Sequence, residues 1–539
     1  MVATPAAPWQ TELERARQAA SLADWSAFQE AIDRLLARWG NHSDALLDAS
    51  ALLLPIGELS QAEALLQWCH QLEPQAPAPL QNLANTWLQS LRQQQAMQLY
   101  TNLAEHQPQA LQPLANALMA LGYGIDQPAQ ASRQLAQRWA QRLLTGVQPS
   151  RPLEPEPVPQ PGQPLRLGFL SADFCQHPVG LFLLPLAEAL AARPDVELWF
   201  YCNSPRHDWL SEQLQRCGQW CSVRGLSDQA LAARIRSDKL AVLVELGGHT
   251  AGSRLAVLAQ QPAPLQLSWL GYWATTGLPL DGVLVDPLEV PPGSPEASSF
   301  VEPLLWLPKT RWVYRPVPWM PAVVDPPCLQ RGWITFGSFN SAAKWNGPLL
   351  RCWAAVLKAV PGSRLRLKNY QLRDQGLRQR LRQLMEAEGV APERLELEGP
   401  SFHQDLLAAY GAIDIALDCF PFNGGLTSCE ALWLGLPLVS MAGHNQAAVM
   451  AARQGLALLE LIGRPQWIAT SVDQYVTIAT TLAANPQALQ EIRHSQRQRI
   501  GASVLCDEQG FADAWLGAVV QCLPSGSRNL ASPVFKDSV

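Results

Sequence analysis

The sequence predicts an α-helical repeat region followed by an α/β fold with two doubly wound parallel sheets. Three observations lead to this prediction: a repeat of 34 positions in residues 1–148, a proline-rich stretch after it, and short apolar runs that alternate with helical stretches from Leu165 onward. The 539 residues are 48% hydrophobic and 16% charged, which is enough to build several packed domains.

Residues 1–148 are rich in Ala, Leu and Gln at helical spacing. A shift of 34 positions brings Gln61, Ala62, Leu65, Pro74, Pro79, Leu80 and Asn82 onto Gln95, Ala96, Leu99, Pro108, Pro113, Leu114 and Asn116. This period with a proline at the repeat end is typical of the tetratricopeptide repeat, whose concave face usually binds peptide. A generic amphipathic bundle gives no reason for the prolines and asparagines to return in register.

Residues 149–164, PSRPLEPEPVPQPGQP, alternate proline with polar residues and predict an extended connector. The apolar runs LRLGFLS, VELWFYC, AVLVELGG and LQLSWLGYW then predict a first sheet in residues 165–320. WITFGSF, SRLRLKN, RLELEGP, DIALDCF and LPLVSMAG predict a second sheet in residues 321–522, followed by a tail at 523–539. Two such lobes suit a ligand bound at the strand carboxyl ends of both.

The formal net charge of −6 argues against a nucleic-acid or anionic-membrane partner bound through bulk electrostatics. The eleven cysteines form no CxxC pair, zinc spacing or disulfide framework, which favours a reducing compartment. We see neither a secretory signal nor an apolar run long enough to span a bilayer, so we expect a cytoplasmic protein.

The first lobe offers candidate groups after three of its strands. His177 follows the first strand in SADFCQHPVG, and His249 follows VLVELGG. Thr275, Thr276 and Gly277 follow LQLSWLGYW and offer neutral groups suited to sugar hydroxyls. Each stretch can also be an ordinary turn at a strand end.

The second lobe offers a positive charge and a helix start. Asn340, Ser341 and Lys344 follow the strand WITFGSF, where a lysine can bind a diphosphate or lie in solvent. The stretch NGGLTSCEAL follows DIALDCF and can be a well-capped helix start or an anion site built from backbone N–H groups.

In NGGLTSCEAL we select Gly424, Gly425, Thr427 and Ser428 for the phosphates, and Glu430 for the ribose hydroxyls. The chain has no GxxxxGK(S/T) loop, no clean GxGxxG after a first strand and no Asp-x-Asp pair. We therefore expect a leaving diphosphate to be neutralised by Lys344 and a helix N-terminus, with no metal or other cofactor.

In this order, the repeats, the connector, SADFCQHPVG, GHTAGSRL, TTGLP, FGSFNSAAK and DIALDCFPFNGGLTSCEAL resemble the O-linked N-acetylglucosamine transferase and SPINDLY-like family. The resemblance covers roughly residues 165–520 and the repeats before them. It implies the two-lobed GT-B fold and metal-independent transfer of a sugar from a nucleotide diphosphate to Ser or Thr of proteins. It makes His177 the active-site histidine, Lys344 the lysine on the leaving diphosphate, the loop 424–427 the phosphate cradle and Glu430 the ribose ligand.

Four positions depart from the family pattern. Leu426 stands where relatives carry a threonine, and Trp273 and Ala274 replace a Pro-Gly turn. Leu406 replaces a histidine, and His403, three residues earlier, is the candidate to take its place near the nucleotide.

We expect inverting transfer of N-acetylglucosamine from its uridine diphosphate donor to protein hydroxyls, with acceptor proteins bound through the repeats. A fucosyltransferase that uses guanosine diphosphate fucose shares nearly every motif. A sugar-nucleotide epimerase would not need peptide-binding repeats. A repeat scaffold with a decayed transferase domain is a third alternative.

Overall fold

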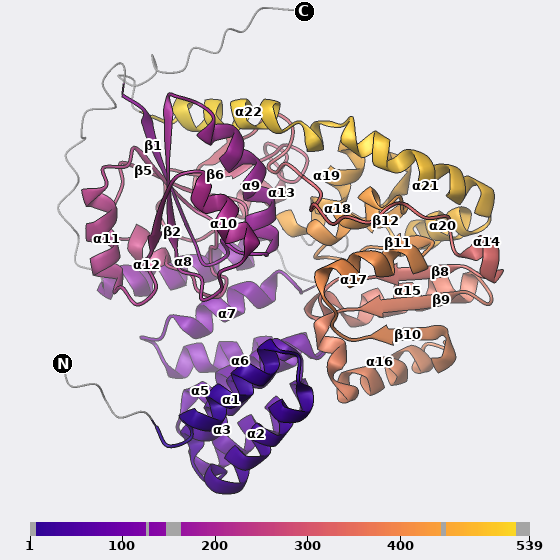
Figure 1. The fold of residues 1–539 in the computed structure, drawn as a ribbon, viewed down its shortest axis with the longest axis horizontal. Coiled ribbons are helices and arrows are strands. Elements are labelled where there is room, and N and C mark those ends of the chain that lie inside the picture. The colour runs from indigo at the N-terminus through magenta and orange to yellow at the C-terminus, as the bar shows by residue number, and fades with distance from the viewer. Residues whose placement is uncertain (1–6, 125–128, 147–162, 444–448, 524–539) are drawn as a thin grey trace, which may run out of the picture.

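The computed structural model describes residues 7–124, 129–146, 163–443 and 449–523. Figure 1 shows a helical region at one end of the molecule and two α/β domains beside each other, which confirms the predicted fold class. The predicted connector 149–164 and tail 523–539 lie outside the described residues, except for residues 163, 164 and 523. No helix in the described part of the chain is long and apolar enough to cross a membrane.

The helical region stacks eight helices, each packed against the next. They are α1 (Gln10–Ser21), α2 (Trp25–Trp39), α3 (Ser43–Ile56), α4 (Leu59–Leu72), α5 (Pro77–Gln89), α6 (Gln93–His106), α7 (Gln112–Leu121) and α8 (Ala129–Gly146). Both ends of α4 and α6 are offset by 34 residues, as the sequence repeat predicts. Ala62 and Ala96 are fully buried, so the repeating alanines lie inside the stack, where small side chains let helices approach closely.

The first α/β domain contains seven parallel strands in the order β3-β2-β1-β4-β5-β6-β7. The strands are β1 (Leu165–Ser171), β2 (Val196–Cys202), β3 (Gln219–Ser222), β4 (Val242–Glu245), β5 (Leu265–Ser268), β6 (Gly282–Val285) and β7 (Leu304–Trp306). The helices are α9 (Pro178–Ala191), α10 (Trp209–Arg216), α11 (Asp228–Ser237), α12 (Leu255–Leu258) and α13 (Pro295–Ser298). Every residue of β4, β5 and β6 is buried, as expected for parallel strands covered on both faces.

The second α/β domain contains six strands in the order β10-β9-β8-β11-β12-β13. The strands are β8 (Thr335–Ser338), β9 (Arg364–Lys368), β10 (Leu395–Glu398), β11 (Ile415–Leu417), β12 (Leu438–Met441) and β13 (Ile468–Ala469). The helices are α14 (Cys328–Arg331), α15 (Gly347–Ala359), α16 (Gln375–Ala387), α17 (His403–Ala409), α18 (Leu426–Trp433), α19 (Gln454–Leu461), α20 (Val472–Ala483), α21 (Pro486–Gly501) and α22 (Glu508–Gln521).

The last helix, α22, crosses back to the first α/β domain and packs on α9 (Figure 1). The ring of Trp515 lies 5.8 Å from Phe169 of β1 and 5.5 Å from Trp269, which follows β5. Trp515 has no exposed surface, so α22 completes the core of the first domain from the far end of the chain.

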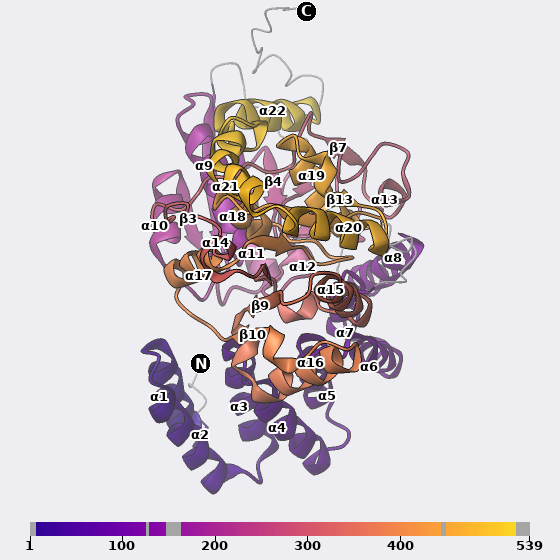
Figure 2. The same cartoon turned by 90° about the vertical axis from the view of Figure 1, so that its right-hand side faces the viewer.

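The helical region contacts both α/β domains. Toward the first domain, Arg133 of α8 donates to the carbonyl of Ser298 at 3.2 Å. Toward the second, α16 lies against α4 (Figure 2), and the short 3₁₀ helix η2 (Tyr370–Arg373) lies against α3. There the Arg373 guanidinium lies 3.6 Å from the ring of Trp25.

Asp374 ties the second α/β domain to the helical region through partly buried hydrogen bonds. Its carboxylate accepts from the backbone N–H and the hydroxyl of Ser60, at 2.7 and 2.9 Å, and caps α16 through the Leu377 N–H at 2.7 Å. A hydrogen bond to a charged group stabilises more than a neutral one. We expect Ser60→Ala to lower the free energy of unfolding by about 1–3 kcal/mol in urea titrations.

Ser495→Ala is the matched control, because the Ser495 hydroxyl is exposed and bonds only to carbonyls of its own helix. Equal unfolding midpoints for the two variants would show that the Ser60 contact contributes nothing to stability.

Candidate active site

Four of the predicted motifs flank the points where the two sheets reverse their winding. In the first sheet the reversal lies between β1 and β4, and in the second between β8 and β11. His177 follows β1, His249 follows β4, Lys344 follows β8 and the loop 418–425 follows β11. Ligands of open α/β sheets bind at the carboxyl ends of strands at such a reversal.

Aromatic contacts connect the carboxyl edges of the two sheets. A methyl group added at Gly425 would lie 3.7 Å from Trp312, and the Trp312 ring stacks on Phe182 of α9 at 5.0 Å and 11°. Because α9 begins directly after His177, these rings link the glycine loop of the second domain to the histidine of the first. Trp312 was not among the predicted site residues; the signal for it is an aromatic residue at the start of the crossing between the lobes.

Lys344 ends the short 3₁₀ helix η1 (Ala342–Lys344), which follows β8. Its ammonium donates to the carbonyl of Asn423 at 2.7 Å and to Asn340 Oδ1 at 3.3 Å, and lies 4.2 Å from the centroid of the Phe422 ring. Burial lowers the pKa of Lys344, and the neighbouring Asp418 carboxylate opposes this shift. The lysine is therefore not the solvated surface residue that the sequence left open.

The Asp418 carboxylate holds the loop that contacts Lys344. Its oxygens accept from the backbone N–H groups of Cys419 and Gly424, at 2.9 and 2.7 Å, and from the Ser440 hydroxyl of β12 at 2.7 Å. Complete burial raises the pKa of Asp418 to about 6, while these donors and Lys344 favour the charged form. Asp418 was not among the predicted site residues; the signal for it is an acidic residue directly after the apolar strand.

Helix α18 begins at the glycine loop without a side-chain cap on its N-terminus. The first N–H groups of a helix have no intrahelical partner, so this end suits an anion. The Thr427 hydroxyl donates to Asn340 Oδ1 at 3.1 Å, and Ser428 Oγ is buried without a hydrogen-bond partner in the described structure.

Gly424 has no room for a side chain in this loop. A methyl group there would lie 2.3 Å from Ser428 Oγ, 2.8 Å from Thr427 Oγ1 and 3.1 Å from Asp418 Oδ1. The structure thus gathers the predicted second-lobe residues Asn340, Thr427, Ser428 and Lys344 around one helix start. Ser341 lies beside them, where its hydroxyl accepts from Gln371 at 2.8 Å.

Glu430 and His403 form a pair behind the helix start. The Glu430 carboxylate is 2% exposed, and its Oε1 lies 3.0 Å from His403 Nε2. Trp319 Nε1 donates to His403 Nδ1 at 3.3 Å, so Nε2 carries the proton and donates to Glu430. Burial raises the pKa of Glu430, and His403 opposes the shift. In this arrangement the carboxylate is already bonded, and its predicted ribose contact stays a prediction.

His177 caps α9 at the carboxyl end of β1, with Nδ1 3.4 Å from the Val179 N–H. Asp173 Oδ1 lies 3.7 Å from the same nitrogen, and 38% of the histidine side chain is exposed. Burial lowers the pKa of His177, Asp173 raises it and Arg206 lowers it further. While Nδ1 accepts from Val179, Nε2 carries the ring proton; in the other neutral tautomer Nδ1–H faces Asp173, and Nε2 can then accept a proton from a bound hydroxyl.

The remaining first-lobe candidates lie inside the protein. Thr275 and Thr276 are fully buried and donate to the Glu302 carboxylate, the former at 2.6 Å. Gly277 has φ +84°, and a methyl group there would lie 2.3 Å from the carbonyl of Ala136 in α8. The predicted sugar contact of these three residues gains no support, because their polar groups bond within the fold or pack on the helical region.

His249 is also internal. Its Nε2 lies 2.9 Å from the carbonyl of Thr276, and its ring contacts Trp139 of α8 at 4.5 Å. Burial lowers the pKa of His249 to about 4, so the imidazole is neutral and donates through Nε2. Its position supports a structural role at the contact with the helical region.

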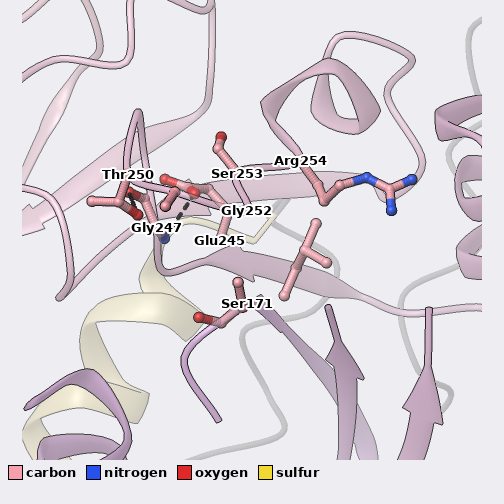
Figure 3. A pocket seen from close by; sticks show the side chains of 10 residues that line it. Ser171, Glu245, Gly247, Thr250, Gly252, Ser253 and Arg254 are labelled. Atoms are coloured by element: carbon pink, nitrogen blue, oxygen red, sulfur yellow. Dashed lines mark hydrogen bonds between the residues drawn. The ribbon is translucent and has the colours of Figure 1, made fainter. Parts of the chain in front are cut away.

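A small cavity lies where β1 and β4 end. Its volume is about 10 Å³, room for one water, and Ser171, Glu245, Thr250 and Arg254 are among its lining residues (Figure 3). Glu245 accepts from the Gly247 and Gly248 N–H groups at 3.0 and 2.8 Å, while Arg254 extends away and pairs with Asp228 at 2.7 Å. The cavity is too small for a sugar. Within the described residues, no group of three or more His, Cys, Asp and Glu side chains is placed to hold a metal ion.

Comparison with known proteins gives a consistent result. The family model for glycosyl transferase family 41 matches residues 135–316 and 328–514. The SPINDLY protein of Oryza sativa subsp. japonica, named a probable UDP-N-acetylglucosamine–peptide N-acetylglucosaminyltransferase, is 35% identical over 423 residues, which cover 77% of this chain and 45% of the rice protein. The SPINDLY protein of Arabidopsis thaliana, which carries the same description, is 36% identical over 358 residues, covering 65% of this chain and 38% of that protein. The chain thus spans less than half the length of these relatives.

Among solved structures, a mutant O-GlcNAc transferase of Thermobaculum terrenum matches with a TM-score of 0.86 and 31% identity. The match covers 98% of this chain and 100% of that one. The helical region and both α/β domains are therefore similar in arrangement to those of that enzyme.

His249 is expected to make the free energy of unfolding decrease as the pH falls. Its folded pKa of about 4 lies below the unfolded value near 6.5, so its contribution is complete above pH 6.5 and lost as the pH falls toward 4. Between pH 7 and pH 5 this group alone costs about 2 kcal/mol of unfolding free energy. We expect His249→Gln, which keeps a donor for the Thr276 carbonyl, to show a correspondingly shallower loss in urea titrations across this range.

His106→Gln controls for the loss of a histidine, because His106 is exposed on α6. An unchanged acid dependence in His249→Gln would mean that the imidazole is not held neutral in the folded protein.

Proposed function

Because the chain belongs to glycosyl transferase family 41, we propose that it is a protein O-glycosyltransferase. It transfers a sugar, most simply N-acetylglucosamine from its uridine diphosphate donor, to Ser or Thr hydroxyls. The named activities of the rice and Arabidopsis relatives and of the Thermobaculum enzyme support this choice of donor.

One observation carries the proposal: the Lys344 ammonium lies beside an uncapped helix N-terminus at the winding reversal of the second sheet. The crowded Gly424 and the unpartnered Ser428 hydroxyl lie at the same helix start. A diphosphate placed there would accept from the N–H groups of α18 and from Lys344. These groups act where negative charge grows on the departing phosphate, which is the most effective use of a fixed donor.

In the proposed reaction the acceptor oxygen forms a bond to the anomeric carbon while the bond from that carbon to the β-phosphate oxygen breaks. The nucleoside diphosphate leaves with the bonding electron pair, and the sugar configuration inverts. The acceptor proton passes to a base at the first-lobe edge, for which the partly exposed His177 is the candidate. Lys344 and the helix amides supply the positive charge, so we include no metal or other cofactor in the proposal.

Partners and location are part of the same proposal. The helical region is consistent with tetratricopeptide repeats, and we propose that acceptor proteins bind through it. All eleven cysteines are free thiols, which supports a reducing, cytoplasmic location.

Lys344→Met is expected to lower the turnover of donor by about 100- to 1000-fold, because a transition-state donor is lost. Calorimetry with uridine and guanosine diphosphates should show weaker binding of the preferred nucleotide, and transfer to peptides is measured by mass spectrometry. Lys358→Met is the control, since Lys358 is exposed on α15 of the same domain.

Full activity of Lys344→Met would remove this residue from the mechanism, and a chain that binds neither diphosphate would be a scaffold. Tighter binding of guanosine diphosphate would favour the fucosyl donor.

His177→Gln is expected to lower kcat/KM by about 100- to 10,000-fold if the imidazole takes the acceptor proton. The pKa of His177 is lowered by burial, so the neutral, active form persists below pH 6.5 and is lost only in more acid solution. In the wild type, kcat/KM should therefore fall with decreasing pH only below pH 6.5. In the variant, this acid-side decrease should be absent. A variant that keeps both the rate and the acid-side decrease would exclude His177 as the base.

A further inference from the structure

Three aromatic rings from three parts of the chain meet next to Lys344. Tyr123 follows α7 of the helical region, Trp273 follows β5 of the first α/β domain and Phe422 follows β11 of the second. The ring centroids of Tyr123 and Phe422 are 5.1 Å apart, those of Trp273 and Phe422 are 4.3 Å apart, and those of Tyr123 and Trp273 are 6.3 Å apart. We call these three residues the aromatic cluster.

Phe422 connects the cluster to the proposed chemistry. Its side chain is 6% exposed, and the Lys344 ammonium lies 4.2 Å from its ring centroid. An aromatic ring attracts a cation through its face, so the orientation of Phe422 decides whether this attraction acts on the ammonium.

Tyr123 fixes that orientation. Its ring lies at 18° to Phe422, in a stacked arrangement, whereas Trp273 meets Phe422 at 74°, in an edge arrangement. The two contacts hold the phenyl ring from different directions. Among the residues that the structure describes, the Tyr123 hydroxyl makes no hydrogen bond, so its contribution comes from the ring.

The end of α7 is shaped to receive Trp273. A methyl group added at Gly122 would lie 2.4 Å from Trp273 Nε1, which is too close for any side chain at this position. Gly122 has φ −59° in ordinary helical geometry, so the glycine is needed for space and not for backbone freedom. The helical region therefore lies directly against the residue that departs from the expected Pro-Gly turn.

We propose that Tyr123 is a positioning residue for Lys344, so that the helical region completes the catalytic machinery of the two α/β domains. Tyr123 holds the plane of Phe422, and Phe422 holds the ammonium toward the start of α18. This inference rests on the proposed function, because it concerns the lysine that binds the leaving diphosphate. A repeat region that binds acceptor proteins would in this way also touch the donor site.

The test measures binding of uridine and guanosine diphosphates to the full chain by calorimetry, using the nucleotide that binds tighter. Tyr123→Leu should raise the Kd about tenfold, and Tyr123→Phe should stay within about twofold of wild type, because only the ring is needed. Tyr123→Met removes the ring but keeps apolar volume, and gives the same readout if Tyr123→Leu does not fold. Trp25→Leu is the matched control: it removes another aromatic contact between the helical region and the second domain, and should leave the Kd unchanged.

A double-mutant cycle separates positioning from a general structural effect. In the Lys344→Met background, Tyr123→Leu should change the Kd by less than about twofold, since its effect acts through the ammonium. Wild-type affinity in Tyr123→Leu or Tyr123→Met, or a loss as large in the Lys344→Met background as in wild type, would overturn the inference while leaving the proposed function intact. If the unsubstituted chain binds neither diphosphate, the proposed function fails and the inference fails with it.

Discussion

The Asp418 carboxylate is the group on which the arrangement of the site depends. It is fully buried, and it gathers two backbone N–H groups of its own loop and a hydroxyl from the next strand. A buried charge is tolerated only when such donors surround it. The same set of bonds places Gly424 and Asn423, so that the Asn423 carbonyl receives the Lys344 ammonium. The Asp418 carboxylate thus organises the loop, and the Lys344 ammonium lies at the start of α18, where we propose that a diphosphate binds.

The helical region also holds the two α/β domains in place. It bonds to the second α/β domain through Ser60 and Asp374 and packs on the first through α8, so it fixes the position of both domains from one side. Interfaces within a chain that are small and polar usually permit domain motion. Here the contacts of the helical region include rings and a buried carboxylate, which favours one relative placement of the two sheets and of the residues at their carboxyl ends.

Much of this architecture could be predicted from sequence, because local pattern reports burial. The 34-residue period gave the stacked helices, and continuous apolar runs gave most strands of both sheets. The strands β3, β7 and β13 lie at sheet edges and are partly exposed, so they lack a long apolar run. The strand β6 is as long and as buried as β4, and its length does not explain why it was not predicted. In the site, Lys344 and the glycine loop lie together because the order of strands brings their loops to one edge. Thr275 and Thr276 could not be judged from sequence, since their partner Glu302 lies 26 or more residues away and only the fold shows that their hydroxyls are occupied.

Because α22 returns to the first α/β domain, it limits which segments can be exchanged between relatives in a chimeric protein. A chimera cut at the crossing between the lobes would pair the core of one parent with the closing helix of another, and Trp515 would meet a surface it did not evolve with. Fragments expressed separately would meet the same obstacle, because the amino-terminal piece would expose Phe169 and Trp269 to water. A recombinant design should therefore exchange the middle of the second lobe and take both ends of the polypeptide from one parent.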